Sequence, residues 1–401
     1  MESIPGLTSL AWIVALAALA PIAIGLMPKP RPPEVVLLLV GGMILGPDIL
    51  DIVNDQADIN LIVQIGLGFL FFVAGYETDL RVIRQRPGQL ALRSWALSIV
   101  LALIAALAAY HFQLVHAPIP VAIALTTTAL GTLLPILKDN GLIHRPLGVN
   151  VTANGTIGEF GPLLAISLFL GTAGIFGAAM SLLIVGGLAA LIAFVPRKVS
   201  DNIREIVDRG QVTSSQTLLR WTVLLLLVLL VVSMRFGLDI VIGAFAAGIV
   251  LRLHNLSGEQ GENDLGRKLE GLAFGFFVPI FFVSSGVTLD LRSIVENPSR
   301  LLAFFVGIIL IRGLPAFLVH TKAVPNVGDR FRLSLYTATG LPVIIAVTTI
   351  AIASGIMLPE NAAALVGAGV LTVLLFPLIA ELIGRRQEQE MEGVDAIAEA
   401  H

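Results

Sequence analysis

Apolar stretches of about 20 residues recur almost without interruption from Leu7 to Ile383, and short polar connections separate them. At about 1.5 Å per residue, a helix of that length crosses a hydrocarbon layer of roughly 30 Å. The pattern predicts an all-α polytopic membrane protein with about 13 transmembrane helices. The candidate segments cover residues 8–27, 34–46, 60–76, 89–109, 118–137, 147–170, 174–195, 217–234, 238–252, 270–287, 300–320, 331–356 and 361–383.

The composition agrees with a membrane setting. Hydrophobic residues make up 56% of the 401 residues and charged residues only 13%, which is more apolar than a soluble core requires. The organisation expected is a transmembrane domain over residues 1–386, followed by a short acidic cytoplasmic tail over 387–401. The longest connection, about 196–217, is polar and could form an amphipathic stretch at the interface. The first apolar segment lacks a basic region before it, so we interpret it as a retained helix.

Several classes of site are disfavoured. The chain has no cysteine, which excludes disulfides, thiolate metal sites and cysteine nucleophiles. Its six histidines fall in connections or at segment ends, unlike the clustered ligands of a metal-dependent intramembrane enzyme. A net charge of -3 gives no argument for a nucleic acid partner. The expected partner is the lipid bilayer, and neither a cofactor nor an enzymatic activity is expected.

Basic residues alternate between the two sides of the predicted bundle. Connections that carry bases such as Arg81, Lys138 and Arg145 alternate with connections such as 47–60 that carry none. Because cytoplasmic loops retain Lys and Arg, this bias predicts the N-terminus outside and the C-terminus in the cytoplasm. The alternation also supports an odd number of crossings. The expected location is the bacterial plasma (inner) membrane.

Two ionisable residues, Glu159 and Arg312, lie deep inside predicted segments, whereas the other charges fall at segment ends or in connections. A charge at membrane depth is costly, so a functional site is the default interpretation. For Arg312, which cannot easily lose its proton, a fixed structural ion pair is the alternative. The pair indicates ion or proton transport.

Two predicted segments are interrupted by hydroxyl residues, glycine and proline. The runs are 124–131, which contains Thr127 and Thr128, and 336–342, which contains Thr339. Irregular backbone at membrane depth is tolerated only where protein or a water-filled cavity satisfies its amides, and paired interruptions in two halves indicate a transporter binding site. The alternative is that the small residues merely allow close helix packing.

Four blocks in sequence resemble the Kef-type branch of the monovalent cation:proton antiporters, the second cation:proton antiporter family. They are Gly66–Leu80, Gly41–Pro47, Ile242–Gly248 and Phe277–Asp290, which are similar to the third, second, ninth and tenth helices of that family. The resemblance runs through nearly the whole hydrophobic portion. It implies the NhaA-like antiporter fold, with inverted repeats, two unwound crossing helices, a dimerisation domain and an ion-translocation domain, and it implies a homodimer.

The resemblance also implies which residues bind the ion. Glu159 occupies the place of the family's essential carboxylate, but it follows Gly158, where the family usually has an aspartate after Asp, Asn or Gln. A single titratable acid favours electroneutral exchange of one proton for one Na+ or K+. Ser284 and Ser285 stand where some charge-moving relatives carry a lysine, and their neutrality favours the same conclusion.

A carboxylate in a dehydrated crevice suits such exchange, because desolvation favours its protonated form and a nearby cation favours its charged form. Proton and cation therefore compete for Glu159. Thr127, Thr128 and Asn154 are candidate oxygen ligands for the cation, with hydrogen bonding to a neighbouring helix as their alternative role. Thr339 is a supporting candidate, and Arg312 is expected to pair with Glu159 or to cap the unwound carbonyls of the twelfth helix.

Two other functions remain open. A passive cation channel would conduct without proton counterflow, although the sequence has no filter-like carbonyl motif. A sodium-coupled organic-anion symporter of similar fold would need more polar groups around the interrupted helices. Kef systems often continue into a nucleotide-binding regulatory domain, but no glycine-rich dinucleotide fingerprint follows the last predicted helix. Control by a nucleotide or by glutathione is therefore not expected from this chain.

Overall fold

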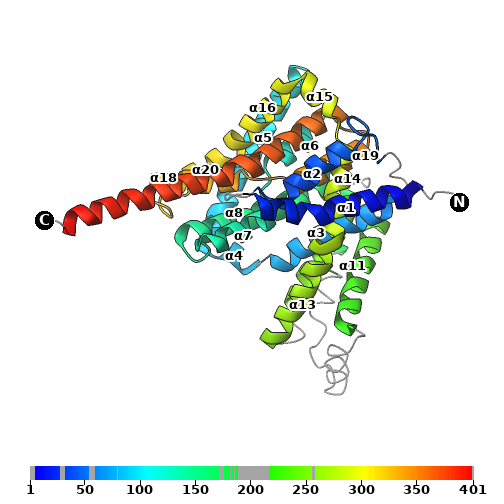
Figure 1. Cartoon of the computed structure of the whole chain (residues 1–401), viewed down its shortest axis with the longest axis horizontal. Helices are drawn as coiled ribbons and strands as arrows, with labels where there is room; N and C mark the ends of the chain where they lie inside the picture. The colour runs from blue at the N-terminus through cyan, green and yellow to red at the C-terminus, as the bar shows by residue number, and fades with distance from the viewer. Residues whose placement is uncertain are drawn as a thin grey trace. The chain divides into compact units, whose positions relative to one another are not determined.

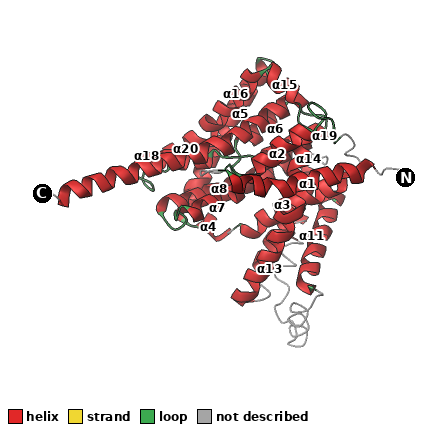
Figure 2. Ribbon diagram, viewed as in Figure 1, coloured by secondary structure: helices red, strands yellow, loops and turns green. Residues whose placement is uncertain are grey.

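The computed structural model describes residues 5–27, 32–53, 59–78, 80–170, 176–180, 182–184, 186–187, 216–254 and 258–399. All regular secondary structure in these ranges is helical (Figure 2). Within them, eight helical stretches are long and apolar enough to cross a membrane, and three shorter apolar helices accompany them. The prediction of an all-helical polytopic membrane protein is confirmed. The chain divides into two units, which are described separately.

Unit 1 comprises Met1–Ile22, Leu38–Thr78 and Ile166–Thr288. It contains most of the first two helices and a group from the middle of the chain (Figure 1). These elements are α1 (Pro5–Leu26), α2 (Glu34–Leu45), α3 (Asn60–Glu77), α11 (Thr217–Arg235), α12 (Ile240–His254), α13 (Gly258–Leu272), the π-helical turn η2 (Ala273–Phe277) and α14 (Val278–Val287).

Glycines bring the helices of unit 1 into backbone contact. A β-carbon at Gly75 of α3 would lie 2.2 Å from the Phe245 carbonyl oxygen of α12, and one at Gly248 of α12 would lie 2.1 Å from the Phe72 carbonyl oxygen. Neither position can hold a larger side chain without a shift. Helices inside membranes commonly associate in this way, because small residues let their backbones approach closely.

We expect Gly75→Ala to destabilise the protein by about 1–3 kcal/mol, because the added methyl forces α3 and α12 apart. Gly271 of α13 provides the matched control, since its β-carbon position has no atom within 4 Å. Gly271→Ala should leave stability unchanged or raise it slightly, as alanine favours helix more than glycine does. Thermal unfolding of the purified protein in detergent measures both variants. Equal melting temperatures for the two would contradict the close packing.

Unit 2 comprises Ala23–Leu37, Asp79–Ala165 and Leu289–His401. Its first group of helices is α4 (Leu80–Arg84), α5 (Arg86–His111), α6 (Pro118–Leu125), α7 (Leu130–Asp139) and most of α8 (Pro146–Phe169). Its second group is α15 (Leu291–Glu296), α16 (Pro298–Ile308), the π-helical turn η3 (Ile309–Gly313), α17 (Leu314–Val319), α18 (Val327–Thr337), α19 (Pro342–Ala353) and α20 (Pro359–Glu399).

The predicted segments coincide with helical elements, apart from the segment 174–195 and the connection 196–217, which fall largely outside the described residues. Both predicted interruptions are confirmed, because α6 is separated from α7 and α18 from α19. The last segment is longer than predicted. Helix α20 continues past 383 to Glu399, in a stretch that has no proline and is rich in helix-favouring Glu, Gln, Arg and Ala.

Both π-helical turns are followed by proline at the same spacing. Pro279 is the second residue after η2, and Pro315 is the second residue after η3. A proline inside a helix has no N–H to donate, and its ring collides with the carbonyl four residues earlier. A wider turn before the proline accommodates this defect without ending the helix. In unit 2, the wider turn carries Arg312.

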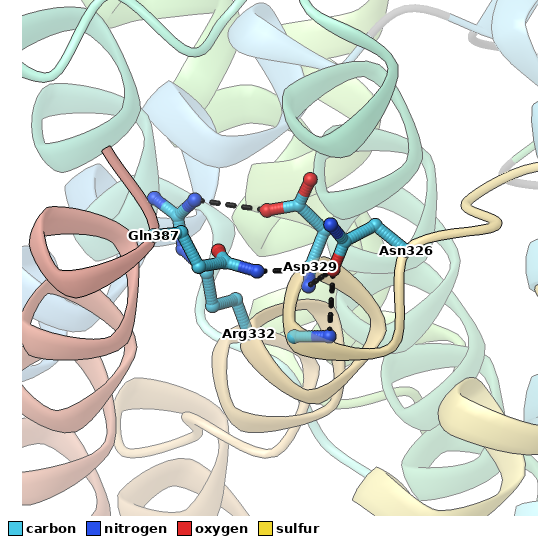
Figure 3. A network of polar contacts seen from close by, with 5 residues as sticks. Asn326, Asp329, Arg332 and Gln387 are labelled. Atoms are coloured by element: carbon cyan, nitrogen blue, oxygen red, sulfur yellow. Dashed lines mark hydrogen bonds and ion pairs between the residues drawn. The ribbon is translucent and has the colours of Figure 1, made fainter. Parts of the chain in front are cut away.

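A polar network joins α18 to the part of α20 that follows residue 383, in unit 2 (Figure 3). The Asn326 Oδ1 atom caps α18 by accepting from the backbone N–H of Gly328 at 2.8 Å and of Asp329 at 3.2 Å. It also accepts a bond of 3.0 Å from Gln387 Nε2 of α20. Arg332 Nη1 lies 2.9 Å from Asp329 Oδ1 and completes the network. One asparagine oxygen therefore serves both the start of α18 and its contact with α20.

Asn326→Ala should lower stability by about 1 kcal/mol, because it leaves backbone N–H groups at the start of α18 without their cap. Gln387→Ala removes only the exposed bond from α20 to Asn326 and should cost a few tenths of that amount. The two variants can be compared by thermal unfolding in detergent. An Asn326 variant that unfolds no earlier than the Gln387 variant would show that the cap is not the main contribution.

Candidate functional site

The two interrupted helices of unit 2 meet at their interruptions. Thr128 Oγ1 donates a bond of 2.6 Å to the Thr337 carbonyl, and the Ala129 N–H donates one of 2.7 Å to the Thr339 carbonyl. The Ala129 N–H lies at the N-cap of α7, the Thr337 carbonyl belongs to the last residue of α18, and the Thr339 carbonyl follows two residues later. Helix ends leave such groups without internal partners. The partial positive end of one half-helix thus meets the partial negative end of another.

The local sequence explains both interruptions. In the first, the Thr126 and Thr127 hydroxyls donate back to the carbonyls of Ile123 and Ala124, which competes with continuation of the helix. In the second, Pro342 cannot donate and disfavours helical geometry in the residue before it. The two segments approach closely at Gly340, where a β-carbon would lie 2.6 Å from Thr127 Oγ1.

Helix α8 joins this junction through the carbonyl of Gly158, which accepts a bond of 2.9 Å from the Thr128 N–H. In a regular helix that carbonyl would accept from residue 162, but residue 162 is a proline and has no N–H. Pro162 therefore frees the oxygen that anchors α8 to the interrupted segment. The next residue is Glu159, which is only 5% exposed. The candidate acid is thus buried beside the junction of the two interrupted helices.

Arg312 is fully buried and connects three parts of the site. Its Nε donates to Thr128 Oγ1 at 2.9 Å, and its Nη2 donates to the Asn154 carbonyl of α8 at 2.8 Å. Since Thr128 Oγ1 in turn donates to Thr337, Arg312 reaches the carbonyls of the second interruption through one hydroxyl. A planar guanidinium can serve two acceptors at once, which a lysine ammonium on a single flexible stem does less well.

The unusual glycine before Glu159 has a steric reason. A β-carbon at Gly158 would lie 2.5 Å from Arg312 Nη2 and 2.5 Å from Thr128 Oγ1. Any side chain at this position would therefore compete with the guanidinium for space. The departure from the family pattern and the buried arginine are parts of one arrangement.

The structure brings together six of the predicted site residues within unit 2, namely Thr127, Thr128, Asn154, Glu159, Arg312 and Thr339. Ser284 and Ser285 lie on α14 of unit 1, where Ser285 Oγ donates to the Phe281 carbonyl at 2.7 Å. The ion-binding roles of these residues stay predictions.

Sequence reasoning missed His320, which caps the end of α17 and is fully buried. Its Nε2 atom lies 3.1 Å from Asn154 Nδ2, and its Nδ1 atom lies 2.9 Å from the Ala316 carbonyl oxygen. The prediction placed His320 at a segment end and gave it no role. A usable signal was its position eight residues after Arg312, which puts both residues on nearly the same face of a helix.

Comparison with known proteins finds a family and relatives that match nearly the whole chain. The profile of a family described as "Sodium/hydrogen exchanger, transmembrane" matches residues 14–384. YjbQ of Bacillus subtilis (strain 168) is 23% identical over 403 residues, which cover 96% of this chain and 64% of YjbQ. The glutathione-regulated potassium-efflux system protein KefC of Shigella sonnei (strain Ss046) is 25% identical over 405 residues, which cover 98% of this chain and 62% of KefC. The chain spans less than two thirds of the length of either relative.

Among solved structures, the sodium proton antiporter MjNhaP1 from Methanocaldococcus jannaschii has the same fold. The superposition has a TM-score of 0.64 with 17% sequence identity, and it covers 94% of this chain and 97% of MjNhaP1.

Proposed function

Because the chain belongs to the sodium/hydrogen exchanger family, we propose that it exchanges protons for Na+ or K+ across the membrane. Glu159 binds either the proton or the cation. The family is one of transporters rather than enzymes. The observation that carries the proposal is the burial of Glu159 directly after Gly158, whose carbonyl is bonded to the first interrupted helix.

The proposed mechanism follows from the chemistry of that carboxylate. An ionised Glu159 is a charge held in a buried place, which is costly, whereas a bound proton or a bound cation neutralises it. The protein changes between its outward-facing and inward-facing states when a proton or a cation is bound, but resists this change when the site is empty. This couples the proton flow to the cation flow. Hydroxyl and amide oxygens of Thr127, Thr128 and Asn154 replace part of the water lost by the cation.

Electroneutral exchange is part of the proposal. Gly158 cannot titrate, so the position before Glu159 supplies no second acid. One site that holds one proton or one monovalent cation moves no net charge in a cycle. Arg312 is proposed to keep its charge throughout and to hold the interrupted segments in place.

The wider architecture belongs to the same proposal. It has about 13 crossings with inverted repeats, the N-terminus outside and the C-terminus in the cytoplasm, and it forms a homodimer in a bacterial inner membrane. Support comes from the distribution of Lys and Arg between connections and from the resemblance of the helical blocks to the antiporter family.

The test uses proteoliposomes with an imposed proton gradient and an internal pH-sensitive dye. We expect Na+ or K+ to dissipate the gradient, choline to leave it intact, and an imposed voltage to have little effect on the rate. Both cations are needed because MjNhaP1 is named a sodium proton antiporter and KefC a potassium-efflux protein. Cation flux without proton movement would indicate a channel instead, and sodium uptake that requires an organic anion would indicate a symporter.

A further inference from the structure

The side-chain amide of Asn154 is held in one orientation by two acceptors. Its Nδ2 lies 2.8 Å from the Asn150 carbonyl oxygen and 3.1 Å from His320 Nε2. A carbonyl oxygen can only accept, so the atom facing Asn150 must be the NH2 group and not the amide oxygen. The contact therefore fixes which way the amide points, a choice that crystallographic density alone often leaves open.

The same reasoning fixes the tautomer of His320. Its Nδ1 faces the Ala316 carbonyl at 2.9 Å, so Nδ1 carries the hydrogen. The Nε2 atom of a neutral imidazole with Nδ1–H has a lone pair, which accepts the second hydrogen of the Asn154 amide. Both hydrogens of that NH2 group are then used.

This arrangement leaves the Asn154 oxygen available. Asn154 is 0% exposed, and its Oδ1 atom has no hydrogen-bond partner among the described residues. The main chain of Asn154 is held as well, since Arg312 Nη2 donates to its carbonyl. A buried amide oxygen without a protein partner is costly unless a ligand satisfies it, and amide oxygens are hard ligands that suit alkali cations.

We propose that His320 is a positioning residue that keeps the Asn154 amide oxygen presented to the transported cation. The inference rests on the proposed function and adds a residue that acts on the cation only through Asn154. Without the imidazole acceptor, the amide can turn over. It would then present its NH2 group, which repels a cation, in place of its oxygen.

Two substitutions of His320 separate this role from simple packing. A glutamine amide can place an oxygen near the position of Nε2 and accept from Asn154, whereas an asparagine amide reaches only to the position of Nδ1. We expect His320→Gln to keep the apparent KM for the cation within about twofold, and His320→Asn to raise it about five- to tenfold, the effect of losing one orienting hydrogen bond. The maximal exchange rate should change less than KM in both.

A double-substitution cycle with Asn154→Ala tests whether His320 acts through Asn154. The pair His320→Asn with Asn154→Ala should have the same apparent KM as Asn154→Ala alone. Cation-induced thermal stabilisation in detergent gives a second readout, since a ligand that binds only the folded state stabilises it by RT ln(1 + [L]/Kd), which falls as Kd rises. It should weaken in His320→Asn and persist in His320→Gln, and it applies to any variant that folds, whatever its transport rate.

The outcomes distinguish this inference from the proposed function. If wild-type protein shows no cation-driven proton movement, the proposed function fails and the role of His320 fails with it. If wild-type protein exchanges, but His320→Asn and His320→Gln have equal KM values or the double substitution is additive, only the positioning role is overturned.

Discussion

Glu159→Gln should reduce cation-driven proton movement in proteoliposomes to the rate of protein-free liposomes. Glutamine has nearly the shape of protonated glutamate but can neither release a proton nor carry the charge that attracts a cation. The variant should therefore fold and insert as the wild type does, because it removes a buried charge without leaving a cavity. Dye-reported decay of an imposed pH gradient, with Na+ or K+ added outside, measures the effect.

Two companion variants sharpen the Glu159 experiment. Glu159→Asp keeps a titratable group but retracts it, so exchange should persist with a changed apparent affinity for the cation. Glu296 is an exposed glutamate on α15 of the same unit, so Glu296→Gln should behave as the wild type. Cation-dependent exchange that survives in Glu159→Gln would refute the proposed role of this carboxylate.

Gly158→Ala should give the second largest effect. The methyl group would occupy the space of Arg312 Nη2 and Thr128 Oγ1, each 2.5 Å from the β-carbon position. The guanidinium must then give up one or both of its bonds, at a cost of about 3 kcal/mol for a buried charged donor. We expect lower thermal stability and a loss of exchange of at least about tenfold. Thermal unfolding and the liposome assay measure the two effects on the same protein.

Gly131→Ala is the matched control for this prediction. Gly131 lies on α7 directly after the first interruption, yet its β-carbon position has no atom within 4 Å. Alanine there should be neutral or slightly stabilising, as expected for an open helical position. If Gly158→Ala retained the stability and the exchange rate of Gly131→Ala, the steric explanation for the glycine would be wrong.

Hydropathy and residue type were sufficient to predict the long apolar helices among the described residues and the two interruptions. Apolar length determines where a chain can cross a bilayer, and three consecutive threonines or a Gly-Leu-Pro run disfavour continuous helix whatever their partners. The resemblance of four blocks predicted the family, and the profile match confirms it. Glu159 and Arg312 could be selected because charge at membrane depth is rare.

The partners of those residues could not be predicted in the same way. Thr128 and Thr337 are 209 positions apart, and Arg312 and Thr128 are 184 apart. Such contacts depend on how distant helices pack, which local patterns do not determine. In the sequence, Pro162 indicates no more than a helix kink. Only the structure shows that the Gly158 carbonyl it frees accepts from the Thr128 N–H. His320 was overlooked for a related reason, since a segment end in the sequence proved to be fully buried.

Two buried bonds run directly between the two broken helices, one from the Thr128 hydroxyl to the Thr337 carbonyl and one from the Ala129 N–H to the Thr339 carbonyl. Within unit 2, neither interrupted segment can slide past the other without giving up these bonds to main-chain carbonyls in a water-poor interior. In the exchange cycle proposed above, the movement that exposes Glu159 first to one aqueous phase and then to the other must therefore carry both segments together, as a single moving part.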